Sequence, residues 1–407
     1  MLRERDYARL LGSGIAYGLG REMAFVAVGW QVYDISRNPL HLGLIGLAEF
    51  IPLPLLALPA GALADRLSRK LVYLWSLLAD ALITALLIVV SLGGADSLWP
   101  FLALAFASGC SAAVANPAVR SMTPTLVPRE LLTSALALRS TFFQGTVVVG
   151  PALGGLLFAV GSAVVYGTAV VLMLVASLLV LGMRPRVVEQ APLELGGTRL
   201  GSLLAGLRFV RRTPVLLGAI SLDLVAVLFG GAVALLPLFA RDVLEVGPVG
   251  LGILRSAPAV GAMTAGIMLT RRPLRGAAGR KLLAVVGIFG ASMVVFGLSH
   301  SFPLSFAALA VGGFADMISM NIRSMIAALA TPDILRGRVN AVEMVFISAS
   351  NELGAFESGA AAALLGAVPA VVVGGSLTIV AALLWPRLFP AMARIDRLES
   401  LHPQAET

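Results

Sequence analysis

Cysteine, histidine and charged residues are all scarce in this chain of 407 residues. The single cysteine, Cys110, lies inside an apolar run, so no disulfide can form within the chain and no cluster of thiolates can hold a metal. The three histidines, His41, His300 and His402, are scattered and do not have the spacing of metal ligands. We therefore predict no metal site and no other cofactor.

Charged residues make up only 13% of the sequence, hydrophobic residues make up 58%, and the mean hydropathy is +0.93. Soluble proteins carry about a quarter charged residues, so this composition excludes an ordinary soluble domain. The apolar residues fall into runs of the length, about 20 residues, that a helix needs to cross a bilayer. In lipid the backbone polar groups must be satisfied within the chain, so these runs are predicted to be helices.

Enzyme signatures are missing from the sequence as well. It has no glycine loop with a lysine that could cradle phosphate, no set of metal ligands and no Ser/His/Asp arrangement, so we predict neither an enzyme nor ATP-driven transport. The net charge of +8 comes from arginine clusters between the apolar runs and forms no basic face, which argues against nucleic-acid binding. An ion gradient remains as the energy source.

Apolar runs and their Gly, Pro and charge boundaries predict twelve membrane spans. The spans are 10–34, 41–63, 70–92, 98–119, 137–160, 162–183, 214–240, 248–270, 281–299, 303–328, 340–364 and 369–389.

The distribution of Lys and Arg among the loops predicts the orientation, because positive residues stay on the cytoplasmic side. Alternate loops and the C-terminal tail are rich in them, whereas the other loops contain little beyond Arg37 and Arg241. Both termini are therefore expected in the cytoplasm of a bacterium, with the chain in the inner membrane.

A polar break near the midpoint predicts four parts of the chain. They are a six-helix bundle at 1–183, a cytoplasmic linker at 184–213, a second six-helix bundle at 214–390 and a cytoplasmic tail at 391–407. Leucines at helical spacing around Arg208 predict an amphipathic helix on the cytoplasmic face of the linker; a fully solvated linker is the alternative.

A short repeat supports two related halves. Arg120-Ser-Met at the end of the fourth span is matched by Arg323-Ser-Met at the end of the tenth, and each is followed by a proline and a charged residue. Parallel repeats of this kind occur in transporters whose halves are related by an axis along the membrane normal.

The loop between the second and third spans reads Gly61-Ala-Leu-Ala-Asp65-Arg66-Leu-Ser-Arg69-Lys70. It resembles the signature loop of the major facilitator superfamily, with serine at a position that is usually glycine. The resemblance implies an all-α membrane protein with twelve transmembrane helices in two pseudo-symmetric six-helix bundles. It also implies that Gly61, Asp65, Arg66, Arg69 and Lys70 form a conformational latch between the halves.

The fifth span contains Gly150-Pro151-Ala-Leu-Gly154-Gly155, which resembles the core of the motif of drug–proton antiporters in this superfamily. The upstream glycine of that motif is displaced to Gly145. A proline beside three glycines makes a thin, bendable helix that can pack closely on a neighbour, and a plain packing helix is the alternative.

Residues 30–43 contain Trp-Gln-Val-Tyr-Asp-Ile-Ser and then Pro-Leu-His-Leu-Gly. This segment resembles the branch of the superfamily that includes enterobactin-type siderophore exporters and macrolide efflux proteins. The resemblance implies export of a small amphipathic molecule.

Polar and ionisable side chains inside the spans are candidates for the transport pathway, because a charge in lipid is costly unless it is paired or faces water. The candidates are Arg21, Glu22, Glu49, Asp223, Arg255, Asp316, Asn351 and Glu352. They fall in spans that, by the resemblance, line the central cavity.

Among these candidates we expect Glu22 to exchange a proton, under the influence of Arg21 or of a cationic substrate. Asp80 in the third span is expected to be a structural partner. Glu343 is expected at the start of its helix, where a carboxylate favours the positive end of the helix dipole.

The sequence therefore predicts a secondary transporter that exports a drug or siderophore by proton antiport and alternating access. Its partners are the small-molecule substrate, protons and membrane lipid, and we expect a monomer. An importer or lipid translocator of the same fold, and a sensor or assembly subunit that transports nothing, remain as alternatives.

Overall fold

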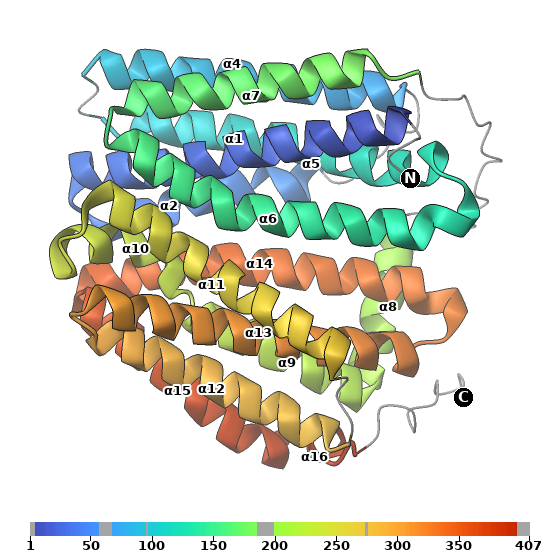
Figure 1. Ribbon diagram of the computed structural model, residues 1–407. Helices are drawn as coiled ribbons and strands as arrows, with labels where there is room; N and C mark the ends of the chain where they lie inside the picture. Colours follow the sequence, from blue (N-terminus) through green and yellow to red (C-terminus); the bar gives the residue numbers. More distant parts are fainter. Residues whose placement is uncertain (1–4, 57–66, 95–96, 185–198, 273–275, 397–407) are drawn as a thin grey trace. The chain divides into compact units, whose positions relative to one another are not determined.

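A computed structural model describes residues 5–56, 67–94, 97–184, 199–272 and 276–396, and these residues form helices and short connections without a strand. Twelve helical segments of the described residues correspond to the twelve predicted spans (Figure 1). In the first half these are α1 (Arg5–Ser36), α2 (Pro39–Phe50), α4 (Arg69–Leu92), α5 (Trp99–Leu126), α6 (Leu132–Phe158) and α7 (Ser162–Leu181). In the second half they are α9 (Pro214–Phe229), α11 (Gly247–Arg271), α12 (Ala278–Leu298), α13 (Phe302–Ala330), α14 (Asp333–Leu365) and α15 (Ala367–Leu388).

Other helical segments connect these twelve. They are η1 (Arg129–Leu131), α8 (Arg199–Arg212), η2 (Ala232–Leu235), α10 (Leu236–Leu238), the π-helix η3 (Phe239–Val243) and α16 (Pro390–Ala393). The helix α8 is the one expected from the leucine spacing; it packs on α14, and its Val210 is buried. Its place on the cytoplasmic face stays a prediction.

Ten helical spans in the described residues are long and apolar enough to cross a membrane, including one at Pro39–Leu56 that extends α2 and one at Pro214–Val243. The remaining two long helices, α1 and α14, have 32 and 33 residues and carry more charge. Their length still exceeds the roughly 20 residues that a span requires. These two charged helices therefore carry several of the pathway candidates.

Most helix ends lie within about five residues of the predicted span ends, and the end of the span predicted at 41–63 lies outside the described residues. The helix predicted at 98–119 continues to Leu126, and two other spans differ more in kind. The span predicted at 340–364 begins at Asp333, directly after Pro332, so Asp333 and not Glu343 is the carboxylate of the first turn. The prediction for Glu343 was therefore wrong. The span predicted at 214–240 breaks after Phe229, where Gly230 and Gly231 lie against Phe289 and the backbone of Gly354.

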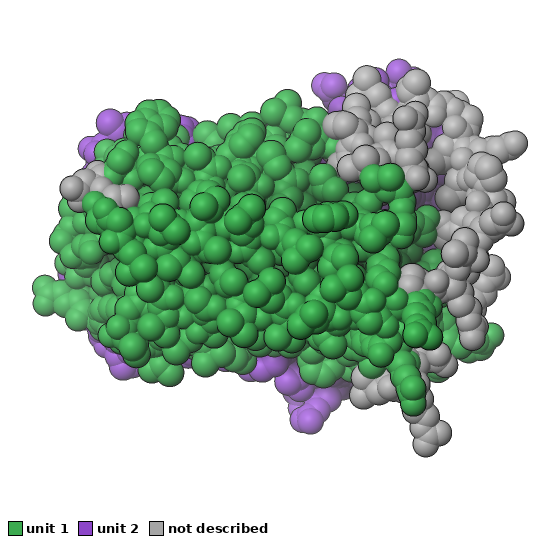
Figure 2. Space-filling model, turned by 90° about the horizontal axis from the view of Figure 1, so that it is seen from above, with its two compact units in different colours: residues 1–193, 236–256 green, residues 194–235, 257–407 purple. Residues whose placement is uncertain are grey.

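Contacts between the helices divide the chain into two compact units (Figure 2). The first comprises residues 1–193 and 236–256, and the second comprises residues 194–235 and 257–407. The segment 236–256, which follows the break in the seventh span, thus clusters with the first unit. The four-part division drawn from the sequence stays a prediction.

Within the first unit, α1 packs against α6 and α7, α4 packs against α5 and α7, and α2 packs against α5. Within the second unit, α12 packs against α13 and α15, and α14 packs against α8 and α9. Besides α6 and α7, α1 contacts α2 and α5, so it lies among four helices of the first unit.

Candidate transport site

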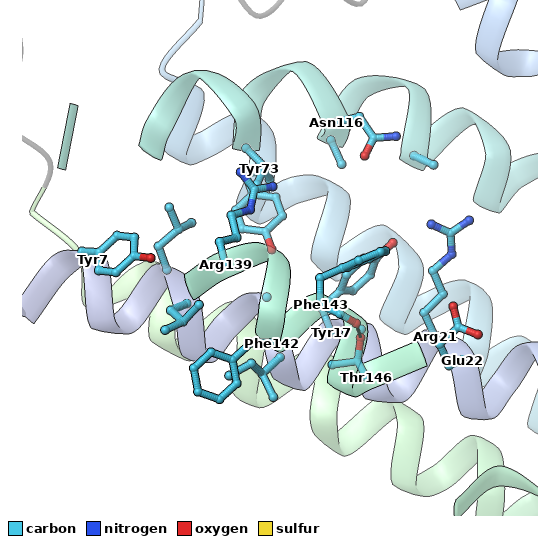
Figure 3. Close-up of a pocket in the computed structure, with 18 residues that line it drawn as sticks. Tyr7, Tyr17, Arg21, Glu22, Tyr73, Asn116, Arg139, Phe142, Phe143 and Thr146 are labelled. Carbon is cyan, nitrogen blue, oxygen red and sulfur yellow. Dashed lines mark hydrogen bonds between the residues drawn. The ribbon is translucent and has the colours of Figure 1, made fainter. Parts of the chain in front are cut away.

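One face of α1 lines a cavity of about 170 Å³ in the first unit (Figure 3). Tyr7, Tyr17, Arg21 and Glu22 follow one another along this helix in the close-up. The other polar and aromatic side chains of the wall are Tyr73 from α4, Asn116 from α5, and Arg139, Phe142, Phe143 and Thr146 from α6. Aromatic faces and two arginines suit an aromatic or anionic group, whereas Glu22 suits a cation or a proton.

Sequence reasoning missed the aromatic residues and Arg139. A signal for the α1 residues was present, because Tyr7, Gly14, Tyr17 and Arg21 recur at intervals of seven, three and four and so share one face of a helix. The contribution of Arg139 depends on how α6 packs against α1, which the sequence pattern does not state. Its guanidinium donates to the hydroxyl of Thr123 at 3.2 Å.

Arg21 forms an ion pair with Glu49 of α2, which joins two residues predicted for the pathway. Arg21 is part-exposed and Glu49 is largely buried. Glu22 is half-buried at the cavity, and no hydrogen bond or ion pair is found for it within the described part of the chain. Neighbouring helix positions do not face each other, so Arg21 points to Glu49 and not to Glu22.

A second cavity of about 70 Å³ lies behind Tyr17 and Arg21. Both side chains line it as well as the larger cavity. Asp80 of α4 lines only the smaller one and is 3% exposed. The Tyr17 hydroxyl donates to its carboxylate at 2.7 Å, and the Ser108 hydroxyl lies 3.5 Å away.

Arg255, a predicted pathway residue of α11, also belongs to the first unit. Its guanidinium lies over the ring of Phe25 on α1, 4.1 Å from the ring centre. A cation at this distance from an aromatic face is attracted by the ring quadrupole.

In the second unit, the predicted residue Asp223 of α9 forms an ion pair with Arg323 of α13. The two side chains are 8% and 7% exposed. Asp316 lies seven residues before Arg323 on the same helix and is exposed. On α14, Asn351 is exposed and Glu352 is half-buried. The sequence identified Arg323 only as part of the repeat; its match Arg120 is exposed, so the two arginines have different surroundings.

Arg37 and Arg241, the arginines that the sequence prediction places in the non-cytoplasmic loops, belong to one ion-pair cluster. Arg241 pairs with Asp34 at the end of α1, and Arg37 lies 3.4 Å from Asp242. The Tyr33 hydroxyl donates to Asp242, and the Arg241 guanidinium lies 5.5 Å from the centre of the Trp30 ring. The outer cluster, as we call Asp34, Arg37, Arg241 and Asp242, thus joins α1 to the seventh span.

Comparisons with known proteins show the family of the chain. The sequence profile described as transmembrane secretion effector matches residues 2–406. The chain belongs to this family of major facilitator transporters. It is therefore a multi-pass membrane protein and a transporter.

Relatives of this family member include the enterobactin exporter EntS of Shigella boydii serotype 18, which is 29% identical over 331 residues, covering 77% of this chain and 75% of the relative. EntS of Escherichia coli O1:K1 / APEC is 29% identical over 332 residues with the same coverage.

Solved structures share the fold. A bacterial homologue of the human lysosomal transporter Spinster, inward-facing and unoccupied, has a TM-score of 0.76 and 16% identity over 95% of this chain and 98% of the other. A bacterial homologue of the iron transporter ferroportin, in an inward-facing state, has a TM-score of 0.70 and 16% identity over 97% and 99% of the two chains.

The family's signature loop is only partly described. Gly61, Asp65 and Arg66 lie outside the described residues. Arg69 donates to the carbonyl of Ser121 at 3.3 Å. Lys70 donates to the carbonyls of Leu181 at 2.8 Å and Met183 at 2.7 Å, where a cation satisfies the last carbonyls of α7.

The glycines of the antiporter-like motif lie at close helix contacts. A Cβ at Gly150 would come within 2.6 Å of the Glu22 Cβ, and one at Gly154 within 2.9 Å of the Met23 Cα, so both glycines allow α6 to approach α1. A Cβ at Gly155 would meet the Pro248 carbonyl and lie 3.0 Å from the Gly252 Cα of α11. Small residues at such positions let helices pack closely in lipid.

A valine at Gly155 is therefore expected to destabilise the protein by about 1–3 kcal/mol, the usual cost of overpacking. Gly145→Val is the matched control, because a Cβ there meets nothing within 4 Å. Unfolding of the purified protein in mixed detergent micelles measures the difference. Equal stabilities of the two variants would show that the α6–α11 contact contributes nothing.

Proposed function

We propose that this transporter exports a small amphipathic organic molecule, a drug or a siderophore, by proton antiport and alternating access. The observation that carries the proposal is the cavity beside α1, where Arg21, Arg139 and Glu22 stand among tyrosine and phenylalanine rings. A pocket with apolar walls and few charges binds molecules that are themselves partly aromatic and partly charged. The similarity to enterobactin exporters supports export of a siderophore-like compound.

The proposed location is the inner membrane of a bacterium, with both termini in the cytoplasm. The Lys and Arg distribution supports this orientation. The outer cluster then lies on the non-cytoplasmic side. The signature loop, with Gly61, Asp65, Arg66, Arg69 and Lys70, lies on the cytoplasmic side and acts as the latch.

In this proposal the pathway residues divide into roles. Arg21 and Arg139 attract the acidic or aromatic part of the substrate, and Glu22 exchanges a proton with water in the cavity. Asp223, Arg255, Asp316, Asn351 and Glu352 complete the pathway, and the Gly150-Pro151 segment with Gly154 and Gly155 lets α6 bend.

Uptake into energised everted membrane vesicles tests the direction of transport, because entry into these vesicles corresponds to export from the cell. The panel comprises a catecholate siderophore, a macrolide and a cationic dye, each with and without an uncoupler. We expect uncoupler-sensitive uptake of at least one compound. Uptake in right-side-out vesicles alone would identify an importer, and no flux in either preparation of folded protein would favour a sensor.

Glu22→Gln is expected to lower gradient-driven uptake by about tenfold and to flatten its pH dependence, because glutamine cannot carry the proton. Glu130→Gln is the matched control, since Glu130 is exposed and lies in η1. The measurement is the initial rate of vesicle uptake at several pH values. If Glu22→Gln matches the control in both rate and pH dependence, Glu22 carries no proton.

A further inference from the structure

Asp80 combines three features that the proposed roles do not use. It lies near the middle of the 24-residue helix α4, it is 3% exposed, and its side-chain partners within the described residues are hydroxyl groups. The Tyr17 hydroxyl donates to one carboxylate oxygen at 2.7 Å, and the Ser108 hydroxyl is 3.5 Å from the other. An ionised carboxylate at such a place is costly unless a cation compensates it.

The charged groups around Asp80 do not balance the negative charge of its ionised carboxylate. The titratable groups that face it are Tyr17 and Arg21 from α1, Glu49 from α2 and Tyr73 from its own helix, while α5 contributes Ser108 and Ser111 and α7 contributes Met173. Arg21 is the cation of this set, and it already forms an ion pair with Glu49. With all three charged groups ionised, Arg21, Glu49 and Asp80 carry one excess negative charge. Binding of one proton makes the set neutral.

The position of Tyr17 and Arg21 connects Asp80 with the larger cavity. Both side chains line the larger cavity on one side and the Asp80 cavity on the other. A molecule in the larger cavity therefore contacts groups that also determine the energy of the Asp80 charge. Two binding events that share such groups change each other's affinity by the same factor.

We propose that Asp80 is a buried proton-binding site of this transporter, linked to occupancy of the larger cavity through Tyr17 and Arg21. The proposal rests on the proposed function of proton-coupled export and adds to it the place where the proton is held. A proton from water joins one Asp80 oxygen on one side of the membrane and returns to water on the other. Glu22, half-buried at the cavity, exchanges protons with the cavity water.

A ligand-free measurement tests the site itself. The purified full chain in lipid vesicles is titrated with pH while infrared difference spectroscopy follows the carbonyl band of protonated carboxyl groups. We expect a titrating band that disappears in Asp80→Asn, stays in Asp333→Asn, and changes its midpoint in Tyr17→Phe, which removes the hydroxyl and keeps the ring. Asp333 is the control because its side chain is 88% exposed. A wild-type protein without such a band, or a band that persists in Asp80→Asn, overturns the proposal.

Transport by the same vesicles separates this proposal from the proposed function, with labelled enterobactin as the probe. Asp80→Asn is expected to keep measurable exchange of the probe at zero gradient, and to lose accumulation driven by a pH gradient by about tenfold. Full accumulation by Asp80→Asn overturns the assignment of Asp80 alone. Exchange by the wild type without any response to the gradient overturns proton coupling, and with it the proposed function.

Discussion

Asp223→Ala is expected to destabilise the protein by about 3–5 kcal/mol, because it leaves a buried arginine without its counter-charge. Arg323 is 7% exposed, and Asp223 is its ion-pair partner. In a membrane helix water is not available to solvate the orphaned guanidinium, so the cost falls on folding. The measurement is reversible unfolding of the purified protein in mixed micelles with a rising fraction of SDS.

Two controls make this prediction specific. The double variant Asp223→Asn with Arg323→Gln removes both charges and is expected to recover most of the loss. Asp333→Ala breaks an ion pair with Arg336 whose side chains are 88% and 48% exposed, and it is expected to cost less than about 1 kcal/mol. If Asp223→Ala is no more costly than Asp333→Ala, the buried pair does not stabilise the second unit.

A cross-link between positions 34 and 241 is expected to stop transport. Asp34 and Arg241 form an ion pair within the first unit that joins α1 to the segment after the break in the seventh span, and we expect the proposed alternating access to require this segment to move away from α1. Cysteines at both positions, in a background with Cys110→Ala, are joined by a short thiol-specific reagent that a reductant can cleave. We expect uptake into everted vesicles to fall by more than about 90% after cross-linking and to recover after reduction.

The control for this experiment is a cysteine pair at positions 6 and 9. Asp6 and Arg9 also form an ion pair, but both lie on α1, so a link between them restrains no movement between helices. Its cross-link is expected to leave uptake unchanged. Undiminished uptake with positions 34 and 241 linked contradicts opening at the outer cluster.

The membrane spans could be predicted from the sequence because their signal is local. An apolar run of about 20 residues has one structure available to it in lipid, whatever its neighbours are. The errors arose where the signal depends on other segments. The break after Phe229 falls at Gly230-Gly231, a dipeptide that can mark a break in the sequence. Its close packing against Phe289 and Gly354 depends on other segments and is visible only in the structure.

The pairing of charges could not be predicted from the sequence. The adjacent residues Arg21 and Glu22 suggest an interaction by proximity in the chain, yet Arg21 pairs with Glu49 and Glu22 has no such partner among the described residues. Pairing follows from which helix faces meet, and this depends on the packing of α1 against α2. The sequence did identify both Arg21 and Glu49 as pathway candidates, although it did not show that they pair with each other.

The role of Asp80 also could not be predicted from the sequence. In the sequence it is one carboxylate in an apolar helix, and a structural partner was the natural expectation. Its burial, its bond to Tyr17 and the prior pairing of Arg21 with Glu49 become visible only in three dimensions. The inference of a bound proton comes from the net charge of Arg21, Glu49 and Asp80 together, and not from the residue type of Asp80.

Proton antiport is tested most directly by proton movement itself. Everted vesicles are energised until their lumen is acid, a pH-sensitive dye reports the lumen, and enterobactin, a macrolide or a cationic dye of distinct absorbance is then added outside. The account predicts that a transported compound makes the lumen less acid, and that vesicles with Asp80→Asn show no such change. Entry of a compound into wild-type vesicles without any loss of luminal protons would contradict proton-coupled export.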